Sequence, residues 1–375
     1  MKTLSNYIEI LEDPRDIRGK KHKLSDILIM TIYGVLCGYT DFVNMTDFLT
    51  LHEQYFIDLL ELENGIPSHD TFSRVFSSID SKKFTDIFIE WIKDIVKQKG
   101  LHVAIDGKAI KSARDKVNGG NTPYILSGFL CDIGLSIGQI KVDDKSNEIT
   151  AIPDLLDLID VKGKIITIDA IGTQEEIANK IVYEKKAAYI LKVKDNQNDL
   201  KDDIKTYVDL EIKNDSPDID ILETPYEKEH GRIEKRTYYI SYDTNCIHDK
   251  KKWQSVKAIG RMDVYREENE VSTLTKNYYI LSQQFSTERF KEITREHWNI
   301  ECSLHWRLDV ILDEDHSTSK KDNSIDNLAI IRKIVFNLAR LDTSMGNLTL
   351  KKKLTRYSFD FKNIENLIFK VIPSL

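Results

Sequence analysis

The sequence has few of the features that mark secreted, zinc-stabilised or membrane proteins. Its 375 residues include four cysteines, Cys37, Cys131, Cys246 and Cys302, with no C-x-x-C pair and no histidine at zinc spacing. We therefore expect four reduced cysteines rather than a disulfide framework or a zinc site. No apolar run reaches the roughly 20 residues that span a bilayer, and the N-terminus has no signal-peptide pattern. The sequence predicts a cytoplasmic protein with no membrane partner.

The chain also lacks an excess of positive charge, because its formal net charge is −7. Proteins that bind nucleic acid usually have a basic footprint, so this balance argues weakly against such a partner. Net charge does not describe distribution, however, and basic residues gather at residues 230–236 and at Lys351–Lys353. Each group by itself is most simply a solvated charged face. A hydrophobic fraction of 41% suffices for a buried core, and 375 residues favour two or three folding units.

The first part of the chain has helical periodicity. Apolar residues at three- and four-residue spacing predict a helix from Leu24, and a second one is expected over Phe42–Leu62. After a break at residues 65–68, we expect a short helix and then another over Ser81–Lys97. We interpret residues 1–98 as an N-terminal helical domain. Such a domain can enter a DNA groove, although most helical domains of this kind serve packing alone.

From residue 101 the periodicity changes to that of an α/β fold. The expected order is three strands, a helix, a strand, a helix, a strand and a further helix, which is an antiparallel meander followed by parallel crossovers. This is the order of a ribonuclease H-like catalytic core, which we assign to residues 99–214 and 287–345. Residues 215–286 are predicted to be a β-rich insertion, and a helix is expected over residues 323–341, with its apolar residues on one side. Residues 346–375 form the C-terminal tail.

Three carboxylates occupy distinctive positions in this pattern. Asp106 and Asp169 each end an apolar run of β type, and Glu301 lies far downstream in a helical, aromatic segment. A carboxylate at the end of a strand can stay solvated or bind a metal, although a single strand that ends in Asp is more often only structural. Three such acids favour a carboxylate cage for Mg²⁺ and phosphate chemistry. Glu296, Asp309 and Glu314 are nearby alternatives to Glu301.

Short motifs along most of the chain make the interpretation more specific. They are Glu12-Asp13-Pro14-Arg15, His22-Lys23-Leu24-Ser25-Asp26, the stretch 64–71, Ala104-Ile105-Asp106-Gly107-Lys108, the stretch 145–153, Thr167-Ile168-Asp169-Ala170, Asn196-Gln197, the stretch 230–234, and His297-Trp298-Asn299-Ile300-Glu301 with His305-Trp306. In these motifs the chain resembles bacterial insertion-sequence transposases of the DDE type, in the branch of H-repeat-associated proteins. The motifs occur in the order found in that family.

The resemblance implies a metal-dependent enzyme that cleaves a DNA strand at an element end and transfers it to target DNA. Asp106, Asp169 and Glu301 would bind two Mg²⁺ or Mn²⁺ ions, with Asp106 bridging them. The partners would be DNA and a second copy of the chain, and the DNA-bound protein would associate with the bacterial nucleoid. The residues expected at the DNA are Lys108, Lys194, Asn196, Gln197, His230, Arg232, Arg236, Arg295, His297 and Trp298. For Trp298 and Trp306, base stacking competes with core packing, and we favour core packing.

The chain also departs from the family pattern. A related signature of Tyr, Arg, Glu and Lys falls here on Thr294, His297, Glu301 and Leu308, of which only the glutamate matches. Asp195 stands where the family has glycine. One alternative is therefore an inactive or domesticated relative that binds DNA without cutting it. A second alternative is a sugar hydrolase, which would use two acids and no metal.

Overall fold

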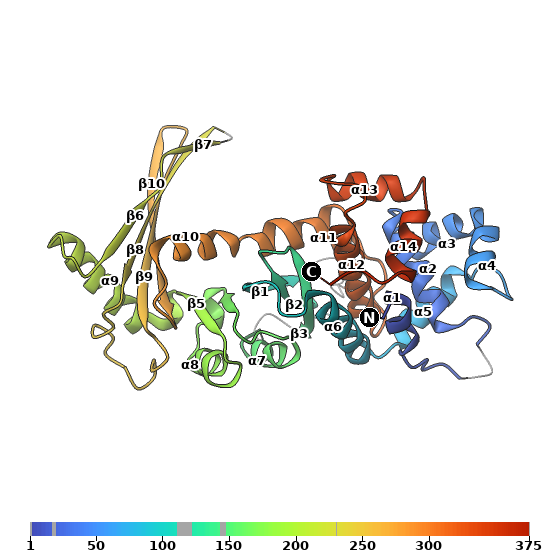
Figure 1. Cartoon of the computed structure of the whole chain (residues 1–375), viewed down its shortest axis with the longest axis horizontal. Coiled ribbons are helices and arrows are strands. Elements are labelled where there is room, and N and C mark those ends of the chain that lie inside the picture. The colour runs from blue at the N-terminus through green and yellow to red at the C-terminus, as the bar shows by residue number, and fades with distance from the viewer. Residues whose placement is uncertain (1, 17–19, 111–121, 143–147, 230, 375) are drawn as a thin grey trace. The chain divides into compact units, whose positions relative to one another are not determined.

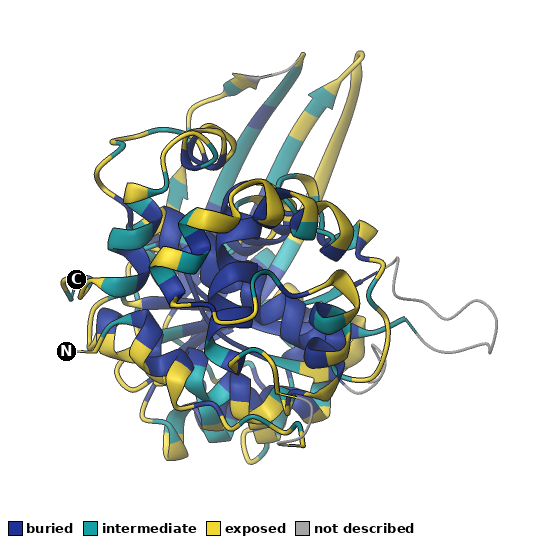
Figure 2. Cartoon of the chain, turned by 90° about the vertical axis from the view of Figure 1, so that its right-hand side faces the viewer, coloured by how far each residue is buried: buried dark blue, intermediate teal, exposed yellow. Residues whose placement is uncertain are grey.

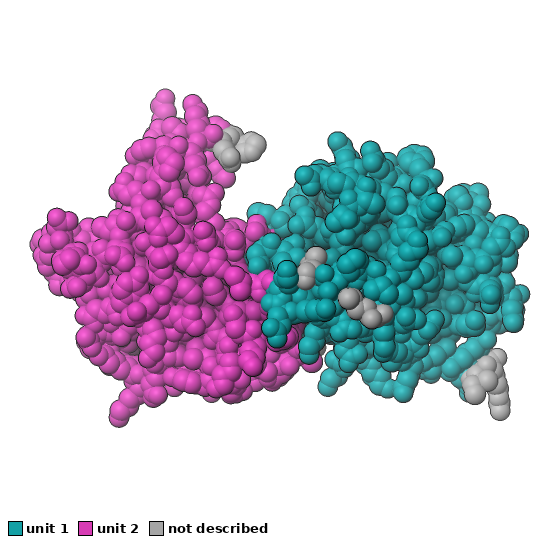
Figure 3. All heavy atoms as spheres, in the orientation of Figure 1, with its two compact units in different colours: residues 1–99, 107–147, 300–375 teal, residues 100–106, 148–299 magenta. Residues whose placement is uncertain are grey.

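We describe a computed structural model of the chain, in which residues 2–16, 20–110, 122–142, 148–229 and 231–374 are described. The chain divides into two compact units (Figure 3). The first unit contains residues 1–99, 107–147 and 300–375, and the second contains residues 100–106 and 148–299. Strand β1 (His102–Ala109) begins in the second unit and ends in the first.

The first unit is mainly helical (Figure 1). Its N-terminal helices are α1 (Leu4–Glu9), α2 (Leu24–Leu36), α3 (Phe42–Leu51), α4 (Glu53–Leu60), α5 (His69–Ser78) and α6 (Ser81–Val96). Its strands are the end of β1, β2 (Tyr124–Leu130) and β3 (Leu135–Val142), and β2 pairs with β3 in antiparallel orientation. Its later elements are the π-helix η7 (Ile300–His305), α11 (Trp306–Val310), the 3-10 turn η8 (Glu314–His316), α12 (Ser324–Leu341), α13 (Leu350–Tyr357) and α14 (Lys362–Phe369).

Helix α12 is the centre of the first unit, because every residue from Ser324 to Ala339 is buried. The sequence predicted one apolar side, and this prediction is wrong: β3 and helices α2, α5 and α6 all pack against α12. Its polar side chains are bonded within the core. Asn337 donates to the carbonyl of Ser136 at 2.8 Å, and Lys333 donates to Oε1 of Gln139 at 2.7 Å. These bonds satisfy polar groups that would otherwise be costly to bury.

The second unit is built on one mixed sheet, with strand order β1-β4-β5-β10-β9-β8-β6 and β7 paired to β8. The strands are β4 (Ile165–Ile168), β5 (Ala188–Val193), β6 (Asp220–Glu223), β7 (Glu227–Glu229), β8 (Arg232–Ser241), β9 (Ala258–Glu268) and β10 (Val271–Leu281). The helical elements are α7 (Glu148–Leu158), η4 (Ala170–Gly172), α8 (Glu175–Asn179), the π-helix η5 (Lys180–Glu184), η6 (Asp195–Gln197), α9 (Asn198–Lys213) and α10 (Thr287–Glu296). Parallel pairing joins β1 to β4 and β4 to β5, whereas the later pairs are antiparallel.

Helix α10 covers one face of this sheet with a hydrophobic core. Phe290 packs there against Tyr238 and Tyr279, and Gly260 of β9 lies directly beneath the ring. A Cβ at Gly260 would come within 2.9 Å of Phe290, so the glycine permits the close approach of helix and strand. Further out, β9 and β10 form a long hairpin, and the first six residues of β10 are exposed whereas its last four are buried (Figure 2).

The expected α/β order from residue 101 is confirmed, as is the presence of free cysteines at all four positions. The single helix expected over Phe42–Leu62 is wrong, because the chain leaves helical geometry at His52 and α4 begins after it. Residues 346–375, which we treated only as a tail, contain α13 and α14. Among the described residues, no helix is both long and apolar enough to cross a bilayer.

Candidate active site

Two of the predicted acids meet at the carboxyl ends of neighbouring parallel strands. In the pairing of β1 with β4, Ile105 lies opposite Ile168. Asp106 and Asp169 are the next residue on each side, so the same register places these two residues at equal positions at one edge of the sheet. Adjacent strands are about 4.8 Å apart, and residues at equal register point to the same face. The second unit therefore brings Asp106 and Asp169 together.

Asp169 is held in its ionised form by its immediate neighbours. Its Oδ1 accepts a hydrogen bond of 2.5 Å from the backbone N–H of Ala170, and Nζ of Lys194 lies 3.5 Å from the same oxygen. Burial alone would raise the pKa of Asp169, but this hydrogen bond and the lysine charge outweigh it and lower the pKa. About half of the side chain, 48%, remains exposed, so a ligand can reach it.

The turn that follows Asp169 is fixed by the two amides of the Asn196-Gln197 motif. Nδ2 of Asn196 donates to the carbonyl of Ala170 at 2.8 Å, and Nε2 of Gln197 donates to the carbonyl of Thr173 at 3.1 Å. Both acceptors lie within four residues of the carboxylate. The sequence predicted Asn196 and Gln197 as DNA contacts, whereas the structure shows what they do within the protein: they hold the backbone beside Asp169.

Four polar side chains form a chain of contacts on the face of the sheet that holds the acids. Two of them belong to β1 and β4, before Asp106 and Asp169, and the other two come from the end of α10. Nδ1 of His102 is 3.0 Å from Oε2 of Glu296, at the end of α10, and its Nε2 is 2.8 Å from Oγ1 of Thr167. The same Oγ1 is 2.8 Å from Nδ1 of His297. Thr167 precedes Asp169 by two positions, so their side chains share a face of the sheet. We call Glu296, His102, Thr167 and His297 the histidine relay.

The histidine relay is uncharged at His297. Burial, reinforced by the nearby His102, lowers the pKa of His297 to about 4, although the Asp169 carboxylate acts in the opposite direction. At neutral pH its imidazole is therefore a hydrogen-bonding group and not a cation. For Glu296, the hydrogen bond from His102 is the largest influence and lowers the pKa, so the carboxylate is ionised. Our expectation that His297 contacts phosphate stays a prediction. Such a contact would be a hydrogen bond from a neutral imidazole and not an ion pair.

The sequence analysis missed His102, Thr167 and Lys192, and it named Glu296 only as an alternative to Glu301. Lys192 follows Leu191, which lies opposite Ile168 in the pairing of β4 with β5, so Lys192 is the neighbour of Asp169 on β5. Burial is the main cause that lowers the pKa of Lys192, and the charge of Asp169 opposes it. Alternation by two from the acids would have pointed to His102 and Thr167. Nothing in the sequence pairs Glu296 with them.

The third predicted acid, Glu301, lies in the first unit, where it is exposed on η7. The two tryptophans near it do not pack in a core. Trp298 is 57% exposed and Trp306 is 53% exposed, so the favoured core-packing interpretation is wrong. Exposed aromatic faces of this kind are available to stack on a base.

Lys108, two residues after Asp106, is enclosed by carboxylates of the first unit. It forms ion pairs with Asp309, with Glu314 at 2.7 Å and with Asp315 at 3.7 Å. Burial opposes its charge, but these acids raise the pKa of Lys108 above its usual value. Burial would likewise raise the pKa of Glu314, yet Lys108 and Lys333 bring it down to about 2. The ammonium of Lys108 therefore forms ion pairs within the first unit, and its predicted contact with DNA stays a prediction.

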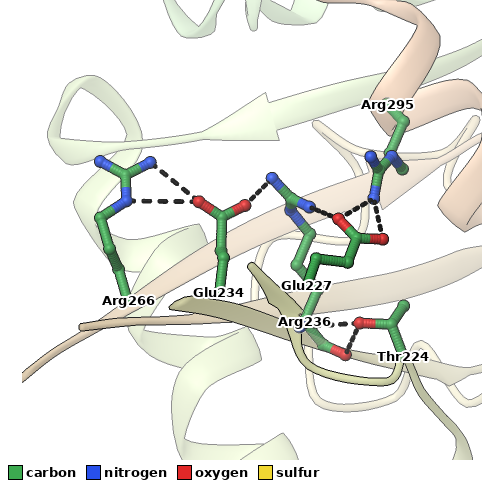
Figure 4. Close-up of polar contacts among 6 residues, drawn as sticks. All are labelled: Thr224, Glu227, Glu234, Arg236, Arg266 and Arg295. Atoms are coloured by element: carbon green, nitrogen blue, oxygen red, sulfur yellow. Dashed lines mark hydrogen bonds and ion pairs between the residues drawn. The ribbon is translucent and has the colours of Figure 1, made fainter. Parts of the chain in front are cut away.

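Two of the predicted DNA-contacting arginines, Arg236 and Arg295, belong to a ladder of alternating charges (Figure 4). Arg266 of β9 pairs with Glu234 of β8 at 3.1 Å, and Glu234 also pairs with Arg236. Arg236 reaches Glu227 at 3.7 Å, and Glu227 pairs with Arg295 of α10 at 3.4 Å. The ladder joins three strands to the helix that ends in the histidine relay. Three arginines and two glutamates leave one net positive charge (3 − 2).

Arg232, at the start of β8, is partly exposed, and His230 lies outside the described residues. Within the described ranges, no group of three or more His, Cys, Asp or Glu side chains is close enough to hold a metal ion. The aligned pair of Asp106 and Asp169 nevertheless fits a hard divalent cation, because both supply carboxylate oxygens and Asp169 is ionised and accessible.

Comparisons with known proteins identify the family. The family model described as "Transposase DDE domain" matches residues 97–338, and "DDE_Tnp_1-associated" matches residues 5–92. In Escherichia coli K12, "H repeat-associated putative transposase YhhI" and "Putative protein YbfL" are each 36% identical, over 96% of both chains. "Putative transposase YncI" of Escherichia coli O157:H7 is 37% identical over 91% of this chain and 88% of its own.

Among solved structures, the chain is similar to a piggyBac transposase in a synaptic complex with hairpin DNA. The identity is 12% and the TM-score 0.46, with 95% of this chain and 76% of that one covered. A likeness this distant says nothing about the site. The family match and the near full-length relatives are decisive, and the chain belongs to the DDE transposases, in the group of H repeat-associated proteins.

Proposed function

We propose that the protein is an active transposase that cleaves a DNA strand at the end of an insertion sequence and transfers it to target DNA. The observation that supports this most directly is the register of β1 and β4, which aligns Asp106 with Asp169 at one sheet edge. A merely structural carboxylate would need no acidic neighbour at the adjacent strand end. Two carboxylates at neighbouring strand ends repel each other unless a cation is bound between them.

In this proposal residues 99–214 and 287–345 make a ribonuclease H-like core. Asp106, Asp169 and Glu301 hold two Mg²⁺ or Mn²⁺ ions, because hard cations take oxygen ligands. The ions, when bound, neutralise the scissile phosphate and make a coordinated water more acidic. Asp106 would hold both ions, since it lies in β1, whose position is fixed by pairing with β4.

The remaining side chains position the acids and the DNA. Lys194 and Lys192 are cations beside Asp169, where they balance its charge before a metal or a phosphate arrives. Asn196 and Gln197 keep the turn after Asp169 in place. The hydrogen bonds of the histidine relay connect β1 and β4 to the end of α10, which keeps the two strand ends in place. All of these side chains belong to the second unit.

DNA would run along the β-rich segment, where phosphates can replace Glu227 and Glu234 as partners of Arg236 and Arg295. Arg232 and His230 would extend this path, and exposed Trp298 would stack on a base. Two element ends must be joined in one reaction, so we propose that the protein acts as a homodimer assembled on DNA.

The test is a cleavage assay with Mg²⁺ on duplex DNA that contains the sequences flanking this gene. The wild-type chain should nick it, and Asp106→Asn or Asp169→Asn should abolish nicking while leaving DNA binding intact. Asp154→Asn, at an exposed position of α7, is the matched control and should cleave normally. EDTA should stop the reaction. Binding without cleavage by the wild-type protein would instead favour an inactive, DNA-binding relative.

A further inference from the structure

A cavity of about 520 Å³ lies in the first unit. It is bounded by the end of α12, by the link to α13 and the first turn of that helix, and by Arg307 of α11. Helix α13 packs against α12, and Figure 1 shows the two helices side by side with α11 close to them. All of these elements belong to the same unit, so the cavity is a property of that unit alone.

The charged residues that line this cavity are mostly cations. They are Arg307, Arg340 and Lys353, against the single carboxylate of Asp342, which gives a formal balance of +2 (3 − 1). By contrast, a cavity beside α9 is lined by four aspartates and only one lysine. A concave surface with a positive excess concentrates anions, because the low-dielectric walls focus the field.

Two of the four charged groups are already used inside the protein. Nζ of Lys353 donates to the carbonyls of Ala339 at 2.8 Å and Asp342 at 2.6 Å, which fastens α13 to the end of α12. The Asp342 carboxylate accepts a hydrogen bond of 2.7 Å from the hydroxyl of Tyr357. Both groups are therefore held in place by contacts within the first unit.

The two arginines have no such partner. Among the residues that the structure describes, neither the Arg307 nor the Arg340 guanidinium has an ion pair or a hydrogen bond to another residue. They are close enough to each other that, after burial, the charge of Arg340 is the main influence that lowers the pKa of Arg307. Arginine stays charged in proteins, so two guanidinium charges line the cavity beside the single carboxylate of Asp342.

The backbone adds to this positive field. Thr349 caps α13 by accepting a hydrogen bond from the backbone N–H of Lys352, and Thr349 and Leu350 line the cavity, so the N-terminal end of this helix lies at it. A helix N-terminus has roughly half a positive charge and binds phosphate groups. Gly134, in the turn between β2 and β3, makes room for Arg340: a Cβ there would lie 2.4 Å from its Nη2.

We propose that Arg307, Arg340 and the first turn of α13 form a phosphate-binding site for the DNA backbone, which we call the arginine pocket. Guanidinium groups bind phosphate through paired N–H donors, and the helix amides complete the ligand shell. The exposed Lys351 and Lys352 continue the positive charge along α13, which favours a polymer of phosphates over a single small anion. This inference rests on the proposed function because it takes DNA as the partner, but it does not require that the protein cleaves DNA.

The test is equilibrium binding of a fluorescein-labelled duplex of about 30 base pairs to the full chain in EDTA, over a range of salt concentrations. Arg307→Gln/Arg340→Gln should weaken binding by about tenfold or more, equally for all sequences, because charge-assisted hydrogen bonds are lost. The slope of log K against log salt should fall by about 1, as expected when one phosphate contact is removed. Lys162→Gln/Lys213→Gln, which removes two exposed charges from the second unit, should change neither quantity to this extent.

Arg307→Lys/Arg340→Lys retains both charges and should keep the salt slope while losing part of the affinity. Arg340 is exposed, so the single Arg340→Gln variant serves if Arg307 proves necessary for folding. A folded Gln variant with wild-type affinity and slope would overturn the arginine pocket, even if the wild-type protein cleaves DNA. Conversely, weakened binding by that variant together with a wild-type protein that never cleaves would refute the proposed function and leave the pocket standing.

Discussion

The histidine relay gives a sharp prediction for Thr167, whose single hydroxyl contacts two imidazoles. The change Thr167→Val replaces that hydroxyl with a methyl group of similar size, so the packing of β4 is largely kept. It removes the contacts at 2.8 Å to Nε2 of His102 and to Nδ1 of His297. Both nitrogens then lose a partner, and His102 is completely buried, so water cannot replace the hydroxyl there.

The magnitude follows from the cost of leaving buried polar atoms without partners. Each such atom costs about 1–3 kcal/mol, so we expect Thr167→Val to lower the free energy of unfolding by about 2–4 kcal/mol. Thr167→Ser keeps the hydroxyl and removes one methyl group, and it should cost only about 1 kcal/mol. The order of stability is therefore wild type, then Ser, then Val. A purely hydrophobic role for Thr167 predicts the opposite order for the two variants.

Chemical denaturation followed by circular dichroism measures these differences. Thr275→Val, on the exposed part of β10, is a matched control and should change stability by less than about 0.5 kcal/mol. Cleavage by the Val variant should fall as well, since Asp169 is two residues along the same strand, and the Ser variant should retain it. A Val variant as stable as the Ser variant would refute the histidine relay as a set of hydrogen bonds.

Two further predictions concern buried charge. The pKa of His297 is depressed from 6.5 to about 4, so the unfolded chain binds a proton that the folded chain does not, and stability is lost as the pH falls from about 6.5 towards 4. His297→Asn should flatten that part of the stability profile measured by denaturation, and an unchanged profile would contradict the assignment. Glu314→Gln should destabilise the protein by roughly 3 kcal/mol, because it removes the most deeply buried of the three carboxylates around Lys108. Asp154→Asn should have little effect in the same denaturation experiment, and equal stability of both variants would show that the pair contributes nothing.

The sequence was sufficient for the parts of the fold that depend on local periodicity. A short apolar run of β-branched residues located β4, and the order of strands and helices from residue 101 was correct. The alignment of Asp106 with Asp169 was also within reach, because both end apolar runs that become adjacent parallel strands. To predict this alignment, one needs only the positions where the two strands end and the rule that the carboxyl ends of parallel strands lie at the same edge of a sheet.

Other features depend on contacts between distant residues, which periodicity does not contain. Helix α12 has charged residues such as Lys333 that look solvent-facing, yet Gln139 of β3 bonds Lys333 inside the core. Trp298 and Trp306 were judged by their hydrophobicity, although they lie beside helix ends that expose them. Arg307 and Arg340 likewise lie on two different helices and are more than 30 positions apart in the sequence. Only the fold shows that these two arginines border one cavity.

The last turn of α10 links two parts of the second unit that the sequence treats as separate. Arg295 pairs with Glu227 in the charge ladder of the β-rich segment, and the next residue, Glu296, holds His102 beneath the acids. Adjacent residues of a helix move together, because backbone hydrogen bonds fix their relative positions. A phosphate that takes Arg295 away from Glu227 therefore acts on the same turn that supports β1 and β4. The charge ladder and the histidine relay therefore meet at two adjacent residues of α10. Through this turn, DNA bound on the β-rich segment would affect the position of Asp169.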